Sequence, residues 1–142
     1  MIAQITEFSA NHPLLAGVFF VLLVALFFNE LKHAAKKFKS LVPAEVIRMM
    51  NNEEVVLLDV REPSETAAGK IARAIQIPAG SVAQRISELE KHRGKPVIVY
   101  CKTGARSGIA CSALNKDGFE NIYSMKGGIL AWQDEHLPVV KK

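Results

Sequence analysis

One cysteine lies where the sequence favours a nucleophile. Cys101 directly follows an apolar run, and residues 102–107 after it read Lys-Thr-Gly-Ala-Arg-Ser. Gly104 permits backbone angles that are closed to other residues, so successive N–H groups can turn inward around one point and bind an anion. A helix that begins near Ser107, with Lys102 and Arg106 nearby, should favour the thiolate form of Cys101. The loop therefore predicts cysteine-based nucleophilic chemistry.

Structural, metal-binding and hydrolase roles have less support for Cys101. A free cysteine is most often a small buried hydrophobic residue, but a loop with glycine and arginine is a poor place for core packing. Cys111 lies on the apolar face of a predicted helix, so we expect a structural role for it, with a role as resolving thiol left open. No Cys-x-x-Cys pair is present, so no metal site is expected, and no cofactor either. A Cys–His hydrolase has no support, because no motif joins Cys101 to any histidine (His12, His33, His92, His136).

The segments around this loop alternate between strand and helix patterns. Continuous apolar runs predict strands at 55–60, 74–77, 96–100 and 121–125. Helical spacing, caps and glycines predict helices at 43–50, 81–94, 107–117 and 128–135. This order predicts an α/β fold with a mostly parallel sheet flanked by helices. Ligands bind at the carboxyl ends of strands in such sheets, which is where Cys101 lies.

The N-terminal part of the chain is strongly apolar. Every residue from Pro13 to Phe28 is apolar or glycine, and as a helix this run rises about 24 Å against a hydrocarbon core of about 30 Å. Extension into the flanking residues predicts one transmembrane helix at 13–31 that contacts the lipid bilayer, with a membrane-protein partner as a further possibility. The remaining expected segments are a short extracytoplasmic N-terminus at 1–12, a basic juxtamembrane linker at 32–42, a catalytic domain at 43–138 and a C-terminal tail at 139–142.

Charge predicts how the chain is oriented. Four lysines follow the apolar run, at positions 32, 36, 37 and 39, and positive residues stay on the cytoplasmic side of a membrane. We therefore expect a single-pass protein of the inner (plasma) membrane with its N-terminus outside and its domain in the cytoplasm. The net charge of +4 comes from 18 basic and 14 acidic residues. Because basic and acidic residues are nearly balanced, no nucleic-acid partner is expected.

The motifs together resemble the rhodanese family. Residues 101–107 resemble its active-site loop, in which cysteine, a basic residue, glycine and arginine form a six-residue cradle. Residues 58–62 resemble its Asp-Val-Arg turn, and residues 69–78 its Gly-His-Ile and Ala-x-x-Ile-Pro stretch. Residues 125–132 resemble its Gly-Gly-x-x-x-Trp close, so the resemblance covers about residues 43–136. The chain departs from the pattern at Lys70 (usually histidine), Thr66 (often aromatic) and Arg73 (usually glycine).

This resemblance implies a bacterial membrane-anchored, single-domain sulfurtransferase. Cys101 would be the catalytic residue and carry sulfane sulfur as a persulfide, taken from a thiosulfate-like donor and passed to a thiol or cyanide. Asp59 and Arg61 would support the site, although a charged turn after a buried strand often has only a structural role. The implied loop that binds the substrate comprises Lys102, Thr103, Gly104, Ala105, Arg106 and Ser107.

Two other functions remain open. A dual-specificity-type phosphatase has five residues between its cysteine and arginine, whereas four separate Cys101 from Arg106. The resulting six-residue loop is narrower and suits a sulfur atom better than a tetrahedral phosphate. A non-catalytic, membrane-tethered docking module of the same fold is the other alternative, and such modules typically lack the cysteine.

Overall fold

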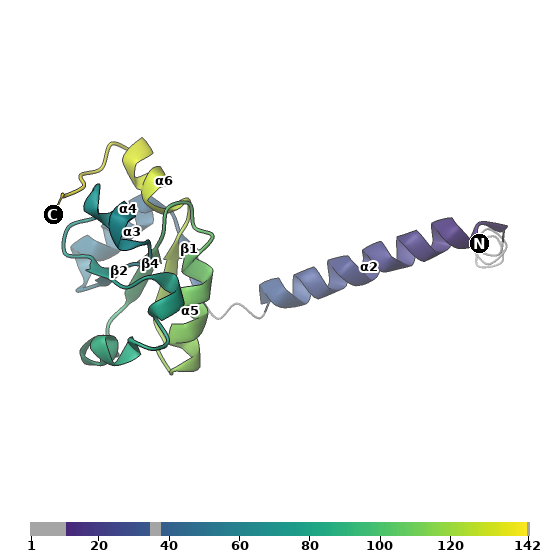
Figure 1. The fold of residues 1–142 in the computed structure, drawn as a ribbon, viewed down its shortest axis with the longest axis horizontal. Helices are drawn as coiled ribbons and strands as arrows, with labels where there is room; N and C mark the ends of the chain where they lie inside the picture. The colour runs from purple at the N-terminus through teal and green to yellow at the C-terminus, as the bar shows by residue number, and fades with distance from the viewer. Residues whose placement is uncertain (1–10, 35–37, 142) are drawn as a thin grey trace. The chain divides into compact units, whose positions relative to one another are not determined.

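The computed structural model describes residues 11–34 and 38–141, which belong to two compact units, Met1–Lys36 and Lys37–Lys142. The first unit contains the helix α2 (Pro13–Ala34), and the second contains a sheet with its flanking helices (Figure 1). Each unit is described by itself.

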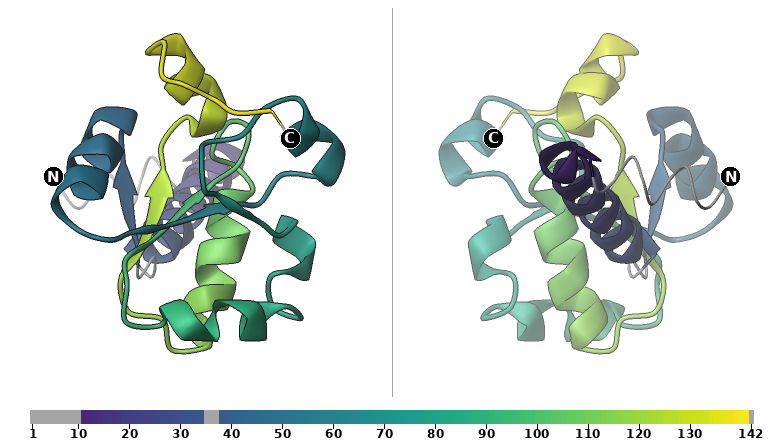
Figure 2. Two further views of the ribbon diagram at one scale, coloured as in Figure 1. Left: turned by 90° about the vertical axis from the view of Figure 1, so that its left-hand side faces the viewer. Right: turned by 90° about the vertical axis from the view of Figure 1, so that its right-hand side faces the viewer.

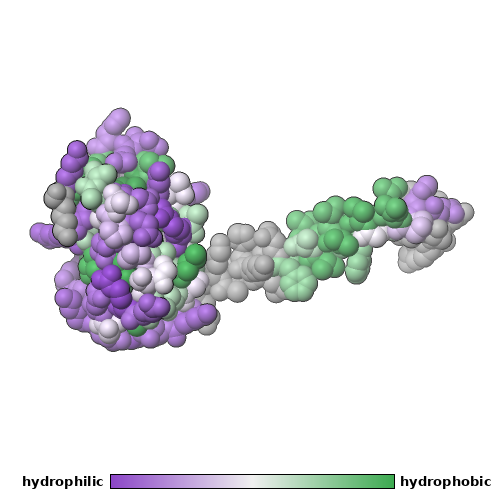
Figure 3. Space-filling view, in the orientation of Figure 1, coloured by the Kyte–Doolittle hydropathy of each residue, from purple (hydrophilic) through white to green (hydrophobic). Residues whose placement is uncertain are grey.

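Helix α2 carries the apolar run of the N-terminal unit. Its large apolar side chains are exposed, with exposed fractions that include 80% for Leu14 and 57% for Phe28. They give the helix an apolar surface (Figure 3). Among residues 11–34 and 38–141, no helix combines the length and the apolarity that a membrane crossing requires. This finding does not support the transmembrane helix predicted at 13–31. No feature of the structure tests the predicted inner-membrane location or the predicted orientation of the chain, so both stay predictions.

The second unit is built on a five-stranded parallel sheet. The strands are β1 (Lys39–Leu41), β2 (Val56–Asp59), β3 (Ile75–Gln76), β4 (Val97–Tyr100) and β5 (Ile122–Met125), in the order β1-β5-β4-β2-β3. All four residues of both β2 and β4 are buried, which explains their continuous apolar sequences. The carboxyl ends of β2 and β4 lie side by side, since Asp59 is in register with Tyr100.

Helices cover both faces of this sheet, as the two views in Figure 2 show. On one face, α5 (Ser107–Lys116) and the 3₁₀ helices η1 (Ala79–Ser81) and η2 (Ile86–His92) pack against alternate strand residues such as Leu58 and Val99. On the other face, α3 (Pro43–Asn52) and α6 (Gly128–Asp134) pack against the intervening residues, such as Leu57 and Ile98. The α/β fold with a parallel sheet flanked by helices is confirmed.

Four local features differ from the sequence expectations. The single helix expected at 81–94 is replaced by 3₁₀ turns, with hydrogen bonds such as Gln84 N–H to the Ser81 carbonyl (3.1 Å). Val82 and Leu89 are nevertheless buried. Strand β1 lies within the expected linker, and three residues at a sheet edge leave too short a pattern to detect. Helix α4 (Pro63–Ala67) follows the Asp-Val-Arg turn and has no counterpart among the expected helices. Within the expected C-terminal tail, Val140 forms an antiparallel bridge with Lys70.

Candidate active site

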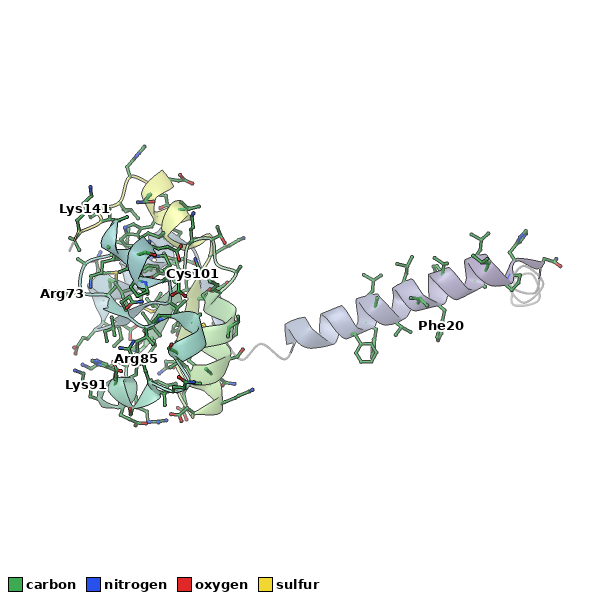
Figure 4. All side chains as sticks on the ribbon, in the orientation of Figure 1. Phe20, Arg73, Arg85, Lys91, Cys101 and Lys141 are labelled. Carbon is green, nitrogen blue, oxygen red and sulfur yellow. The ribbon has the colours of Figure 1, made fainter. Side chains whose placement is uncertain are left out.

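Cys101 lies in the loop between the end of β4 and the start of α5, inside the domain (Figure 4). Its side chain is 1% exposed, and its Sγ accepts a hydrogen bond from the Gly104 N–H at 3.0 Å. Gly104 has a φ of +101°, a left-handed value that lets the chain fold back over the sulfur. The loop thus directs the N–H of Gly104 at the sulfur.

Arg106 closes the loop by binding Glu65 of α4. The guanidinium Nη1 donates to Oε2 at 2.7 Å and Nη2 donates to Oε1 at 2.9 Å, so the pair is bidentate. The Glu65 Oε2 also accepts the backbone N–H of Glu62 at 3.1 Å, which fixes the carboxylate on the first turn of α4. The hydrogen bond from Arg106 lowers the pKa of Glu65 to about 2, so both partners are charged near neutral pH.

Asp59 and Arg61 hold α4 against the sheet. Asp59 is fully buried at the end of β2, and its Oδ2 accepts Arg61 Nη2 at 2.6 Å. The same nitrogen donates to the Gly69 carbonyl at 2.7 Å, and Nη1 donates to the Glu65 carbonyl at 3.3 Å. The Thr66 hydroxyl donates to Asp59 Oδ2 at 3.3 Å, so threonine at this position joins the same network. Asp59 and Arg61 thus position the helix that carries Glu65.

The start of α6 holds the backbone of the cysteine loop. The N–H of Ile129 donates to the Cys101 carbonyl at 2.8 Å, and the N–H of Leu130 donates to the Lys102 carbonyl at 3.2 Å. Gly128 has a φ of +61°, and a Cβ built at this position would collide with the Cys101 and Lys102 carbonyls. The close approach between these two turns therefore requires glycine at position 128.

Of the remaining loop residues, Ser107 supports the loop backbone and the others are exposed to solvent. Ser107 is buried, and its Oγ donates to the Gly104 carbonyl at 2.8 Å and lies 2.7 Å from the Ser124 Oγ. Lys102, Thr103 and Ala105 are exposed. Their side chains face solvent.

Cys111 has a different environment. It is fully buried in the core beneath the sheet, and burial raises the pKa of its thiol to about 12. A thiol with that pKa stays protonated near neutral pH and is a poor nucleophile. This environment agrees with the structural role expected for Cys111.

A small cavity opens beside the cysteine loop. It has a volume of about 230 Å³ and is lined by residues of the loop, of α4 and the turn after it, and of α6, among them Lys102, Glu65 and Leu130. Among residues 11–34 and 38–141, no group of three or more His, Cys, Asp or Glu side chains is placed to hold a metal ion.

Comparison with known proteins identifies the family. The sequence pattern of the Rhodanese-like domain matches residues 42–135. The chain belongs to the rhodanese family. This match covers strands β2 to β5, the helices that flank the sheet and the whole cysteine loop.

Three known proteins are similar to this chain over most of the rhodanese domain, and one of them is similar over nearly the whole chain. Uncharacterized protein YibN of Escherichia coli K12 is 34% identical over 139 residues, which is 97% of each chain. A protein named Sulfurtransferase from Allochromatium vinosum is 41% identical over 93 residues, 66% of this chain and 85% of its own. Thiosulfate sulfurtransferase GlpE of Pseudoalteromonas translucida is 32% identical over 105 residues, 74% of this chain and 98% of its own.

Two positioning residues of this rhodanese loop are not identified as site residues by sequence alone. Glu65 lies within the family resemblance but has no predicted role, because its partner Arg106 is 41 residues away in the chain. Gly128 is predicted as the start of a helix and as part of the Gly-Gly-x-x-x-Trp motif, but its contact with the Cys101 carbonyl depends on tertiary packing. The Gly-Gly sequence at 127–128 is the available signal, since adjacent glycines mark a backbone that needs unusual angles.

Proposed function

We propose that this rhodanese is a sulfurtransferase that works through a persulfide on Cys101. The Cys101 thiolate attacks the outer sulfur of thiosulfate or a similar donor, the donor's S–S bond breaks, and sulfite leaves with the bonding electron pair. The product is a Cys101 persulfide. A thiolate or cyanide then attacks the outer sulfur, and the S–S bond of the persulfide breaks to regenerate the Cys101 thiolate.

One observation carries this proposal: the Gly104 N–H lies 3.0 Å from the Cys101 sulfur, within a loop held on both sides. A fixed N–H donor next to the sulfur stabilises negative charge on it without reorganisation during the reaction. Arg106 holds the loop through Glu65, and α6 holds it through the carbonyls of Cys101 and Lys102. The exposed Lys102 at the mouth supplies a positive charge that attracts an anionic donor. The relatives named as sulfurtransferases support the same assignment at the level of the family.

The phosphatase alternative conflicts with the position of Arg106. A phosphatase of this kind needs the guanidinium to bind the oxygens of the phosphate. Here both terminal nitrogens of Arg106 donate to Glu65, at 2.7 and 2.9 Å. The docking-module alternative requires no reaction at all, so a test for chemistry on Cys101 separates it from the proposal.

The deciding experiment is mass spectrometry of the full-length protein after exposure to thiosulfate. We expect Cys101 to gain the mass of one sulfur atom and to lose it again on addition of cyanide with release of thiocyanate. Cys101→Ser should abolish both steps. Cys111→Ala should retain both, because the Cys111 thiol is buried and protonated. Absence of the sulfur adduct on a folded wild-type protein would reject the proposal, and hydrolysis of a phosphate ester in its place would favour the phosphatase.

A further inference from the structure

Ser124 is a polar residue at a buried position of an otherwise apolar strand. It belongs to β5, is 5% exposed, and is in register with Val99 of the neighbouring strand β4. Residues two apart in a strand point to the same face, and Ile122 packs on the face that α5 covers, so Ser124 points toward α5. A hydroxyl buried at such a position costs free energy unless it forms a hydrogen bond. Ser124 therefore needs a polar partner, and Ser107 at the start of α5 is that partner.

The single proton of the Ser107 hydroxyl assigns the direction of the hydrogen bonds around it. The Ser107 Oγ lies 2.8 Å from the Gly104 carbonyl, which can only accept, so the Ser107 proton is donated to this carbonyl. The contact of 2.7 Å between the two serine Oγ atoms then requires the proton of Ser124. The Ser124 hydroxyl thus donates to Ser107, which donates to Gly104. In such a series each hydrogen bond polarises and strengthens the next one.

Gly104 is the residue held at the end of this series of hydrogen bonds. Its carbonyl accepts from Ser107, and its N–H donates to the Cys101 sulfur at 3.0 Å. A Cβ at position 104 would lie 3.4 Å from the backbone nitrogen of Gly127, so Gly104 also packs against the turn that follows β5. The position of its N–H relative to the sulfur therefore depends on contacts from β5 as well as on the loop itself.

From these contacts we infer that Ser124 is a positioning residue for sulfur transfer. It acts through Ser107 and keeps the Gly104 N–H directed at the reacting sulfur. This inference rests on the proposed persulfide chemistry, and it adds to the same site a residue that lies outside the cysteine loop.

The two half-reactions differ in how the charge on the Cys101 sulfur changes. During loading, the thiolate attacks the outer sulfur of thiosulfate and loses its negative charge as the new S–S bond forms, while sulfite leaves with the electron pair of the broken bond. During transfer, cyanide attacks the outer sulfur of the persulfide, and a C–S bond forms in thiocyanate. The S–S bond to Cys101 breaks, and its electron pair returns to the Cys101 sulfur. Because a fixed N–H donor stabilises charge that develops beside it, Ser124 should matter most in the transfer step.

The test measures the two half-reactions separately, in single-turnover experiments on the full-length protein. Loading from thiosulfate is followed by mass spectrometry at a pH where its rate no longer rises with pH, so that the amount of thiolate does not differ between variants. Transfer is followed as thiocyanate released by cyanide from the loaded protein after the donor is removed. We expect Ser124→Ala to slow transfer about three- to tenfold, the effect of one lost buried hydrogen bond, and to change loading by less than about twofold.

Two further comparisons distinguish positioning from a general loss of stability. Cys111→Ala is the matched control, because it also removes one buried γ atom between α5 and the sheet. It should lower the melting temperature as Ser124→Ala does but leave the transfer rate unchanged. In a protein that already carries Ser107→Ala, adding Ser124→Ala should cause little further loss of transfer rate, because Ser124 acts through Ser107.

The outcomes separate this inference from the proposed function. If the wild-type protein forms no sulfur adduct on Cys101, the proposed function fails at the loading step and the role of Ser124 fails with it. If the wild type loads and transfers sulfur but Ser124→Ala transfers it equally fast, or slows both half-reactions to the same extent, only the positioning role is rejected. Additive losses from Ser107→Ala and Ser124→Ala in the double variant would show that the two serines act independently and would also overturn the inference.

Discussion

Arg106 and Glu65 are joined by two parallel hydrogen bonds, at 2.7 and 2.9 Å, which connect the cysteine loop to α4. Glu65 is fixed in turn by the Glu62 N–H, and α4 is fixed by Arg61. The conformation of the loop thus depends on a connected set of polar contacts that begins at the end of β2. The first two predictions test this dependence.

Removing the charge of Glu65 should impair the reaction more than the fold. In Glu65→Gln the amide has one oxygen and cannot accept both guanidinium N–H groups, so the loop loses its fixed geometry. We expect kcat for sulfur transfer to fall about tenfold or more, which corresponds to an increase of roughly 1.4 kcal/mol in the activation barrier. The matched control is Glu88→Gln, which removes another bidentate pair, with Arg85 at 2.6 and 2.9 Å, away from the loop. Steady-state kinetics of both variants decide the matter, and equal effects of the two substitutions would contradict the role of Glu65.

The pH dependence of the unfolding free energy should reflect the ion pair between Glu65 and Arg106. The pKa of Glu65 is about 2 in the folded protein, lowered from 4.5 mainly by the hydrogen bond from Arg106. Because the folded-state pKa is lowered, the contribution of Glu65 to stability is present above about pH 4.5 and is lost as the pH falls toward 2. Urea unfolding of wild type and Glu65→Gln should therefore show a difference in unfolding free energy that is constant from pH 7 to about 5 and shrinks below that range. A difference that grows as the pH falls would contradict the prediction.

Gly128 should be intolerant of any side chain. At a φ of +61°, alanine carries a backbone cost of about 1–2 kcal/mol, and its Cβ would collide with the Cys101 and Lys102 carbonyls. We expect Gly128→Ala to lower the unfolding free energy by at least about 2 kcal/mol and to displace the loop. Gly80→Ala is the control, because no heavy atom lies within 4 Å of a Cβ at that position. Thermal unfolding and cyanide-dependent turnover would measure both effects, and equal melting temperatures for the two variants would argue against the close approach.

Much of this fold follows from local sequence, and the site follows only in part. The buried strands β2 and β4 have continuous apolar sequences, and Cys101 directly follows one of them, so the strands and the position of the loop were predictable. Arg106 was expected to be part of the loop, but its partner Glu65 is 41 residues distant, and no periodicity within one segment encodes such a pairing. Short elements such as β1 and α4 were missed because three to five residues contain less than two periods of any pattern.

Arg73 shows that a departure from a family pattern can have a direct stability consequence. The position usually holds glycine in the rhodanese pattern, and Arg73 has a φ of +63°, the left-handed region that favours glycine. We expect Arg73→Gly to raise the unfolding free energy by about 0.5–1 kcal/mol, since relief of the left-handed strain outweighs the greater flexibility of glycine in the unfolded chain. Arg73→Ala is the matched control, because it removes the same exposed side chain but keeps the Cβ that causes the strain. Chemical denaturation of the three proteins should place Arg73→Gly above both others, with sulfur loading on Cys101 unchanged; equal stability of the glycine and alanine variants would show that the backbone angle is not the cause.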